Sequence, residues 1–263
     1  MSISLGTALI TGASEGIGAI YADRLARRGY DLVLVARNGD KLRALAESLG
    51  AATGRTVQVL PADLTDPAHL GLVEARLRAE PAIDLLVNNA GSSTVSAFAE
   101  LASNQLDTIL DLNVTALTRL AWAATGAMTP RGKGSVINIG SVVSLALLPN
   151  AALYSATKAF VLTLTQALHG ELASKGLRFQ AVLPGATRTD IWAKSGLPVE
   201  HLPQEIVMEA DAMVDAALAG YDQGELVTIP ALVDVAGWTQ LEAARVALNG
   251  QLSLSQPAPR YHV

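Results

Sequence analysis

A tyrosine and a lysine four positions apart are the first residues in this chain that could do chemistry. Tyr154 and Lys158 lie in a segment of helical period, so their side chains leave the same face of that helix. A tyrosine with the ordinary pKa of about 10 does not release its proton readily at neutral pH. A neighbouring ammonium group favours the phenolate and lowers this pKa, so the pair could act as a general acid or base. Taken alone, such a pair is more often a solvated helix face.

Ser141 follows a short apolar segment, 135–139, that we expect to form a strand. A residue just past such a strand lies at the carboxyl edge of a parallel sheet, where open α/β sheets bind ligands. Its hydroxyl group could hydrogen-bond a substrate oxygen. An isolated serine in a loop usually has no such role, so this inference depends on the surrounding motifs.

Residues 11–18 read TGASEGIG and lie between the first expected strand and the first expected helix. Glycine is needed where the chain turns tightly, where the backbone approaches a pyrophosphate and where helix and strand pack closely. The helix N-terminus then offers free N–H groups to phosphates. Glycine turns also occur for structural reasons alone, but the strand before and the helix after are the context of a dinucleotide site. The predicted cofactor contacts in this turn are Gly12, Ser14, Glu15, Gly16, Ile17 and Gly18.

The end of the second expected strand indicates which dinucleotide is bound. An NAD site usually has an acidic residue there for the ribose 2′-hydroxyl, whereas here Ala36 is followed by Arg37. The guanidinium group of Arg37 suits a phosphate dianion, such as the 2′-phosphate of NADP. The alternative is that Arg37 is an ordinary surface arginine. Glu15 opposes the assignment, because a basic residue at that position would have supported a 2′-phosphate. We therefore expect NADP(H), with NAD(H) as the alternative.

These residues require a scaffold of alternating strands and helices. The apolar segments are nearly continuous, which indicates strands buried on both faces of a parallel sheet. The pattern predicts an α/β fold, a Rossmann-type doubly wound sheet of seven parallel strands with helices on both faces. The expected strands are 5–11, 31–36, 57–60, 84–88, 135–139, 179–183 and 226–229, and the expected helices are 17–28, 41–49, 67–78, 103–128 and 154–175.

Neither a break in composition nor an internal repeat marks a linker, so we expect a single domain over 1–263. Within it, 190–225 is expected to cover the substrate, and 231–263 is a helical extension. We expect amphipathic helices over 203–222 and 233–248 and an extended or frayed end over 256–263. The helix 233–248 could pack on the domain, close the substrate mouth or contact a neighbouring subunit.

Composition excludes several classes of function. Of the 263 residues, half are hydrophobic, and 19 basic and 24 acidic side chains give a net charge of −5, so disorder and nucleic-acid wrapping are not expected. The chain has no cysteine, which excludes disulfides and thiolate sites. The apolar stretches are too short for a membrane span and there is no secretory signal, so a cytoplasmic protein is expected. No metal site is expected, because metal-binding spacings are absent around the four histidines, His69, His169, His201 and His262.

The residues described above and several further motifs make the sequence resemble the short-chain dehydrogenase/reductase family over about residues 5–190. The motifs appear in the family's order: the glycine turn, an Asp-Leu pair after the third strand, Asn-Asn-Ala-Gly after the fourth, an Asn in the next helix, Ser ahead of YxxxK, and Pro-Gly after the sixth strand. In this chain they begin at Gly12, Asp63, Asn88, Asn113, Ser141, Tyr154 and Pro184.

The resemblance implies hydride transfer between a nicotinamide and a carbonyl or secondary alcohol carbon. Tyr154 would be the general acid in reduction, Lys158 would bind the nicotinamide ribose and tune Tyr154, and Ser141 would orient the substrate oxygen. Asn113 would hold the water through which protons reach Lys158. Besides Tyr154 and Lys158, the resemblance implies cofactor contacts from Asp63, Leu64, Asn89, Ala90, Gly91, Pro184, Gly185, Thr187 and Thr189.

The segment 191–207 lies where this family covers its substrate. Trp192, Leu197 and Leu202 predict a mainly apolar pocket for a ketone or aldehyde without carboxylate or phosphate, and His201 fits a surface histidine better than a substrate contact. The hydrophobic residues after Ser141 could form a pocket wall or belong to the core; they are Val142, Val143, Leu145, Leu147 and Leu148.

Two other functions occur on scaffolds of this kind. A regulatory protein that binds NADP without catalysis would typically lack the Tyr or the Lys, and both are present. A sugar-nucleotide epimerase or dehydratase would need a longer substrate domain. The family also pairs the helices corresponding to 113–128 and 154–175 across a two-fold axis, which implies a homodimer or homotetramer.

Overall fold

The protein is described by a computed structural model that covers residues 5–195 and 197–261, apart from the side chains of Ala193 and Lys194. Contacts divide the chain into two compact units, Met1–Pro230 and Ala231–Val263. The α/β sheet belongs entirely to the first unit. In the second, α9 (Ala236–Ala247) has no buried residue and a short 3-10 turn follows at Pro259–Tyr261.

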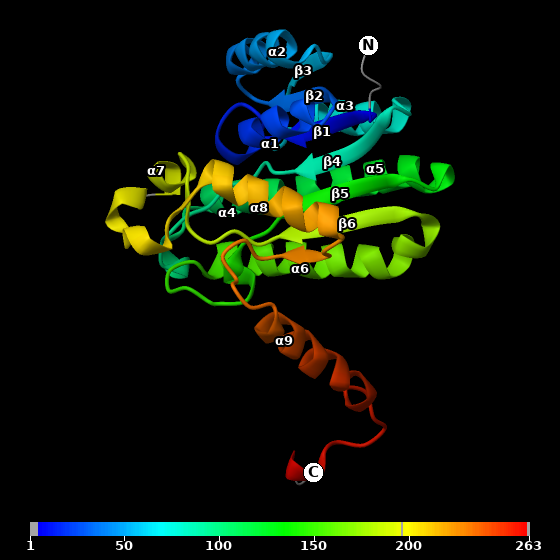
Figure 1. Ribbon diagram of the computed structural model, residues 1–263. Coiled ribbons are helices and arrows are strands. Elements are labelled where there is room, and N and C mark those ends of the chain that lie inside the picture. Colours follow the sequence, from blue (N-terminus) through cyan, green and yellow to red (C-terminus); the bar gives the residue numbers. More distant parts are fainter. Residues whose placement is uncertain (1–4, 196, 262–263) are drawn as a thin grey trace. The chain divides into compact units, whose positions relative to one another are not determined.

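Across the described part of the first unit, seven strands form one sheet in the order β3-β2-β1-β4-β5-β6-β9, and every neighbouring pair is parallel (Figure 1). The predicted doubly wound sheet is therefore confirmed. The strands are β1 (Thr7–Thr11), β2 (Asp31–Ala36), β3 (Val57–Pro61), β4 (Ile83–Asn88), β5 (Gly134–Ile139), β6 (Leu177–Val182) and β9 (Val227–Thr228).

Helices cover both faces of this sheet, because successive strand residues point to opposite sides. In β1, Ile10 belongs to one buried cluster and its neighbour Leu9 to the other. The first cluster joins the sheet to α1, α2 and α8, and the second joins it to α3 and α5. The helices of the unit are α1 (Gly16–Arg27), α2 (Gly39–Thr53), α3 (Pro67–Ala79), α4 (Ser103–Leu110), α5 (Leu117–Met128), α6 (Ala152–Leu172), α7 (Ile191–Ser195) and α8 (Ala210–Gln223).

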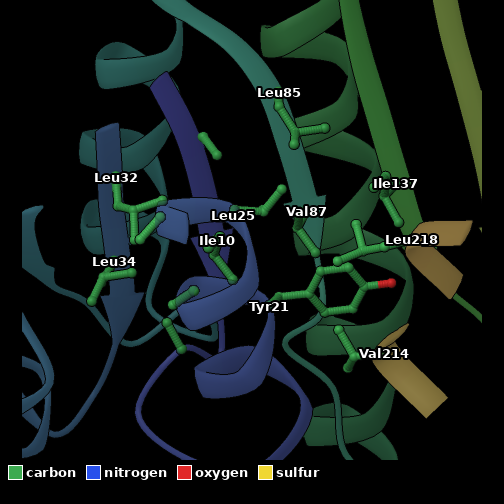
Figure 2. Close-up of a cluster of buried hydrophobic side chains, with 14 of the residues drawn as sticks. Ile10, Tyr21, Leu25, Leu32, Leu34, Leu85, Val87, Ile137, Val214 and Leu218 are labelled. Carbon is green, nitrogen blue, oxygen red and sulfur yellow. The ribbon is translucent and has the colours of Figure 1, made fainter. Parts of the chain in front are cut away.

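Figure 2 shows the first cluster, in which Tyr21 of α1 lies among strand side chains and two residues of α8. Val214 and Leu218 approach it from α8, and Val87 and Ile137 approach from β4 and β5. All five side chains are almost completely buried. Each buried aliphatic side chain contributes roughly 1.5–3 kcal/mol, so this packing fixes α1, whose N-terminus follows the glycine turn.

Short-range signals set where the helices begin. Asn38 caps α2 by accepting a hydrogen bond from the backbone N–H of Lys41 at 3.0 Å. Asp66 caps α3 through the N–H groups of Ala68 and His69, and Pro67 occupies the first turn, where its missing N–H costs nothing.

One expectation about helices was wrong and another lacked a detail. Residues 103–128 are helical throughout, as expected, but a π-helical turn, Asp111–Ala116, lies between α4 and α5. The helix expected over 203–222 begins only at Ala210, because Met208 and Glu209 form a short strand, β8 (Met208–Glu209), that pairs with β7 (Thr187–Arg188). Hydrophobic periodicity predicts neither the π-helical turn nor the strand β8, and the strand depends on a pairing partner about 20 residues away.

None of the helices in the described ranges is both long enough and apolar enough to cross a membrane.

Candidate active site

The carboxyl ends of the parallel strands open into one cavity of about 1050 Å³. Residues directly after β1 to β6 line it, as expected for ligand binding in an open α/β sheet. One residue from each strand end is Gly12, Arg37, Asp63, Asn89, Ser141 and Pro184, in chain order.

The glycine turn brings its backbone against the loop after β4. Gly12 has a φ of +65°, and Gly16 has a φ of +54°, conformations that favour glycine. Asn89 fixes the turn by donating from Nδ2 to the carbonyl oxygens of Thr11 at 2.9 Å and Gly12 at 3.2 Å. Gly18 does not line the cavity, but a Cβ there would overlap the Gly12 carbonyl oxygen and lie 2.6 Å from Asn89 Nδ2. Its role is close packing under the turn.

Charged side chains gather at the end of the cavity next to β2 and β3. Arg37, Lys41 and Glu15 all line it, and Lys41 Nζ lies 2.7 Å from Glu15 Oε2. That hydrogen bond raises the pKa of Lys41. Burial raises the pKa of Asp63, but hydrogen bonds from Thr65 and the charge of Arg37 bring it below its ordinary value, so Asp63 is ionised.

Ser141 follows β5 and is held by backbone groups. Its Oγ accepts from the N–H of Val143 at 3.3 Å and donates to the carbonyl oxygen of Pro184 at 3.4 Å. It also hydrogen-bonds the side chain of Tyr154. The two hydroxyl groups therefore face one region of the cavity, where both could contact the same ligand oxygen.

Tyr154 and Lys158 share one face of α6, as predicted. Burial raises the pKa of Tyr154 to about 12, and the hydrogen bond with Ser141 acts in the opposite direction. Burial also lowers the pKa of Lys158 to about 8. Lys158 Nζ donates to the Ile139 carbonyl oxygen at 2.9 Å and lies 5.7 Å from the centre of the Tyr154 ring.

The sequence predicted that the ammonium of Lys158 would lower the pKa of Tyr154 toward neutrality. That prediction was wrong for the site as it stands, because burial raises the pKa of Tyr154 more than the hydrogen bond with Ser141 lowers it. Tyr154 is consequently a protonated phenol at neutral pH, the form required of a general acid.

Asn113 is buried in the π-helical turn and does not line the cavity. Its side chain accepts from the N–H of Ser92 at 2.9 Å and donates to the Ser92 carbonyl oxygen at 2.9 Å and to Thr157 Oγ1 at 3.1 Å. Gly91 lies between Asn113 and the lysine, because a Cβ at Gly91 would be 3.0 Å from Asn113 Oδ1 and 3.7 Å from Lys158 Nζ. The amide thus fixes the loop beside Lys158.

The other end of the cavity is mostly apolar. Trp192 is fixed there by a hydrogen bond from its indole N–H to the Thr187 carbonyl oxygen at 2.8 Å. The remaining apolar lining includes Val95, Leu112, Val142, Val143, Leu148, Pro149, Ile191, Leu197, Leu202 and Ile206.

Comparison with known proteins decides the family. A family model described as short chain dehydrogenase matches residues 6–198. The chain belongs to the short-chain dehydrogenase/reductase family. It is an oxidoreductase, as the sequence predicted.

Solved structures resemble this dehydrogenase/reductase over nearly its whole length. A short-chain dehydrogenase from Sphingobium yanoikuyae, in complex with NADPH, is 50% identical with a TM-score of 0.94, and the match covers 97% of this chain and 98% of that one. A bulky-bulky ketone specific alcohol dehydrogenase from Comamonas testosteroni is 46% identical with a TM-score of 0.91, covering 98% and 99%. The glycine betaine reductase ATRR of Emericella nidulans is 38% identical over 72% of this chain, which spans only 15% of that relative's length.

The residues at the strand ends fit the NAD(P) of this family. Gly12 and Gly16 bring backbone without a side chain to the cavity wall, and Arg37 and Lys41 offer cationic donors in the same cavity. With the exception of Gly18 and Asn113, every predicted site residue lines that cavity. Those lining it are Gly12, Ser14, Glu15, Gly16, Ile17, Arg37, Asp63, Leu64, Asn89, Ala90, Gly91, Ser141, Tyr154, Lys158, Pro184, Gly185, Thr187 and Thr189.

Some expectations about the substrate end of this dehydrogenase/reductase need correction. Leu145 and Leu147 neither line the cavity nor belong to the core, since 39% and 83% of their surface is exposed. His201 is exposed and does not line the cavity, which confirms the expected surface histidine, and His262 lies outside the described residues. Of the segment 190–225, the cavity lining ends at Ile206, because α8 packs into the core against α1.

Sequence reasoning missed several polar residues in and around the site, of which Asn38, Lys41 and Thr157 matter most for its chemistry. Asn38 and Lys41 line the cavity next to Arg37, and the Asn that precedes the second helix was a capping signal that could have placed both. Thr157 falls within the YxxxK motif, but no local pattern indicates that its hydroxyl hydrogen-bonds Asn113.

Proposed function

We propose that this enzyme transfers hydride between NADP(H) and the carbonyl or secondary alcohol carbon of a mainly apolar small molecule. The observation that carries the proposal is the shared cavity: Ser141 and Tyr154 line it together with a set of apolar side chains, and the cations Arg37 and Lys41 line it as well. The relative solved with NADPH supports the cofactor, and the relative described as specific for bulky-bulky ketones supports the substrate class.

The chain's own residues divide the work. Ser141 and Tyr154 bind the substrate oxygen, and in the reductive direction Tyr154 Oη gives its proton to that oxygen as the carbonyl becomes an alcohol. Lys158 stabilises the resulting phenolate, because it lies within 5.7 Å of the ring. The apolar wall around Trp192 excludes water and holds the substrate. When bound, the nicotinamide supplies or accepts the hydride.

Cofactor binding would be divided among three groups of residues. The glycine turn, Gly12 to Gly18, would hold the pyrophosphate, with free N–H groups at the start of α1. Arg37 would contact the 2′-phosphate, and Asp63 and Leu64 would flank the adenine. The nicotinamide end would contact Asn89, Ala90, Gly91, Tyr154, Lys158, Pro184, Gly185, Thr187 and Thr189.

Asn113 acts as a positioning residue in this proposal. Its side chain is committed to Ser92 and Thr157, so any water that relays protons to Lys158 would depend on the backbone that this amide holds in place. The π-helical turn around Asn113 favours this role, since such turns are frequent at functional sites.

A carbonyl panel tests the proposal. NADPH consumption, followed at the nicotinamide absorbance band, is expected with aryl and alkyl ketones that carry two large apolar substituents. Matched keto acids, which differ by one carboxylate, are expected to react much more slowly because the wall offers few charged anchors. Tight NADPH binding without turnover of any carbonyl class would contradict catalysis and favour a regulatory NADP-binding protein.

We also propose that two copies pair through α5 and α6. Trp122 and Phe160 carry 63% and 36% exposed surface on these helices, more than such large side chains usually leave in water. Light scattering at micromolar concentration is expected to give a dimer or tetramer, and a monomer would refute the pairing.

A further inference from the structure

Glu15 is the residue that fits a 2′-phosphate site least well. It precedes α1, its side chain makes no capping hydrogen bond, and it lines the cavity near Arg37. A carboxylate beside a phosphate dianion is repulsive, and neither group is fully screened in a cavity.

The surrounding charges make this repulsion more serious. Asp63 lies close enough to Arg37 for the guanidinium to lower the pKa of its carboxyl, so part of the charge of Arg37 is already compensated. Asp190 also lines the cavity and acts electrostatically on Lys41. This end of the cavity therefore carries three carboxylates, those of Glu15, Asp63 and Asp190. The single positive charge of Arg37 does not balance their negative charge.

Lys41 adds a second positive charge at this end of the cavity. Its Nζ lies 2.7 Å from Glu15 Oε2, and both side chains line the cavity. The position of Lys41 is fixed by the cap of α2, where Asn38 Oδ1 accepts from the Lys41 backbone N–H at 3.0 Å. Asn38 directly follows Arg37 in the chain. The cap therefore brings the start of α2, with Lys41, to the same end of the cavity as Arg37.

We propose that the Glu15–Lys41 ion pair is a second determinant of NADP(H) preference. Lys41 neutralises Glu15 and presents its remaining ammonium hydrogens to the 2′-phosphate, while Glu15 holds Lys41 in that position. This deepens the proposed function, since it rests on NADP(H) being the cofactor. The chain thereby supplies the second cation from the start of α2 in place of a basic residue in the glycine turn.

The test measures cofactor binding, not turnover. Dissociation constants for NADPH and NADH are obtained from nicotinamide fluorescence for wild type, K41A, E15Q and the double variant. Arg43→Ala is the matched control, because Arg43 also lies in the first turns of α2 and pairs with a carboxylate, Asp40, but does not line the cavity.

Loss of a charge-assisted contact and exposure of Glu15 should raise the Kd of K41A for NADPH about 10-fold or more, with the Kd for NADH changed less than about 2-fold. In the K41A background, E15Q should recover part of the loss because the uncompensated carboxylate is gone. Arg43→Ala should change neither Kd.

Equal effects of K41A on both cofactors, or none on NADPH, would overturn the inference while leaving the proposed function intact. A wild-type enzyme that binds NADH at least as tightly as NADPH would contradict the proposed cofactor itself, and the inference with it. Binding at low and high salt gives an independent check, since the NADPH preference should narrow as ionic strength screens the pair.

Discussion

Asn113 and Thr157 are joined by a buried hydrogen bond, from Asn113 Nδ2 to Thr157 Oγ1, across 3.1 Å. Thr157 in turn donates to the Tyr154 carbonyl oxygen at 2.8 Å. The bond therefore connects the π-helical turn to the start of α6, where Tyr154 and Lys158 lie. The Thr157 hydroxyl group thus bonds both segments at once.

Replacing Thr157 with valine keeps the side-chain shape but removes that hydroxyl. We expect kcat to fall about 10-fold and the free energy of unfolding to fall by about 1–3 kcal/mol, because the buried amide of Asn113 loses one of its two acceptors. Thr157→Ser keeps the hydroxyl and should retain near wild-type kcat. Steady-state kinetics with thermal unfolding checks this. Equal kcat for the valine and serine variants would show that Thr157 does not position the site.

Gly18→Ala should damage cofactor binding although Gly18 does not line the cavity. The added methyl would meet the Gly12 carbonyl oxygen and Asn89 Nδ2, so the glycine turn must shift. We expect the Kd for NADPH to rise about 10-fold or more. Gly71→Ala in α3 is the control, because nothing lies within 4 Å of that methyl position and alanine favours a helix. If both variants bind NADPH like wild type, the turn is not held by close packing.

The rate of carbonyl reduction should decline as pH rises through about 8. Tyr154, with a pKa raised to about 12 by burial, keeps its proton across this range. Lys158, with a pKa lowered to about 8 by burial, loses its charge and can no longer stabilise the phenolate that forms. A kcat profile from pH 6 to 10 measures this. Lys158→Arg keeps its charge, so the decline should vanish at a lower overall rate; a decline unchanged in that variant would assign it to another group.

Much of the fold could be predicted because strand burial and helix period are local signals. The apolar run at 31–36 matches β2 residue for residue, and the proline at 67 marks the start of α3. Three site residues could be predicted for the same reason. Ser141 follows a strand end, and Tyr154 and Lys158 are one helical turn apart, so local patterns place all three at one edge of the sheet.

The rest depends on contacts between distant segments. The pKa of Tyr154 follows from burial that only the folded cavity produces. The ion pair between Glu15 and Lys41 joins residues 26 positions apart, so Glu15 read in isolation argued against NADP(H). The β7–β8 pairing, which shortened the helix expected at 203–222, joins segments about 20 residues apart in the same way.

Tyr154→Phe tests the central claim most directly, because it removes only the phenolic hydroxyl. Single-turnover oxidation of bound NADPH by a reactive ketone should slow by at least about 100-fold, the usual contribution of a general acid. The Kd for NADPH should stay within about 2-fold of wild type, which separates catalysis from binding. Near wild-type turnover with NADPH bound would contradict the assignment of Tyr154 as the proton donor.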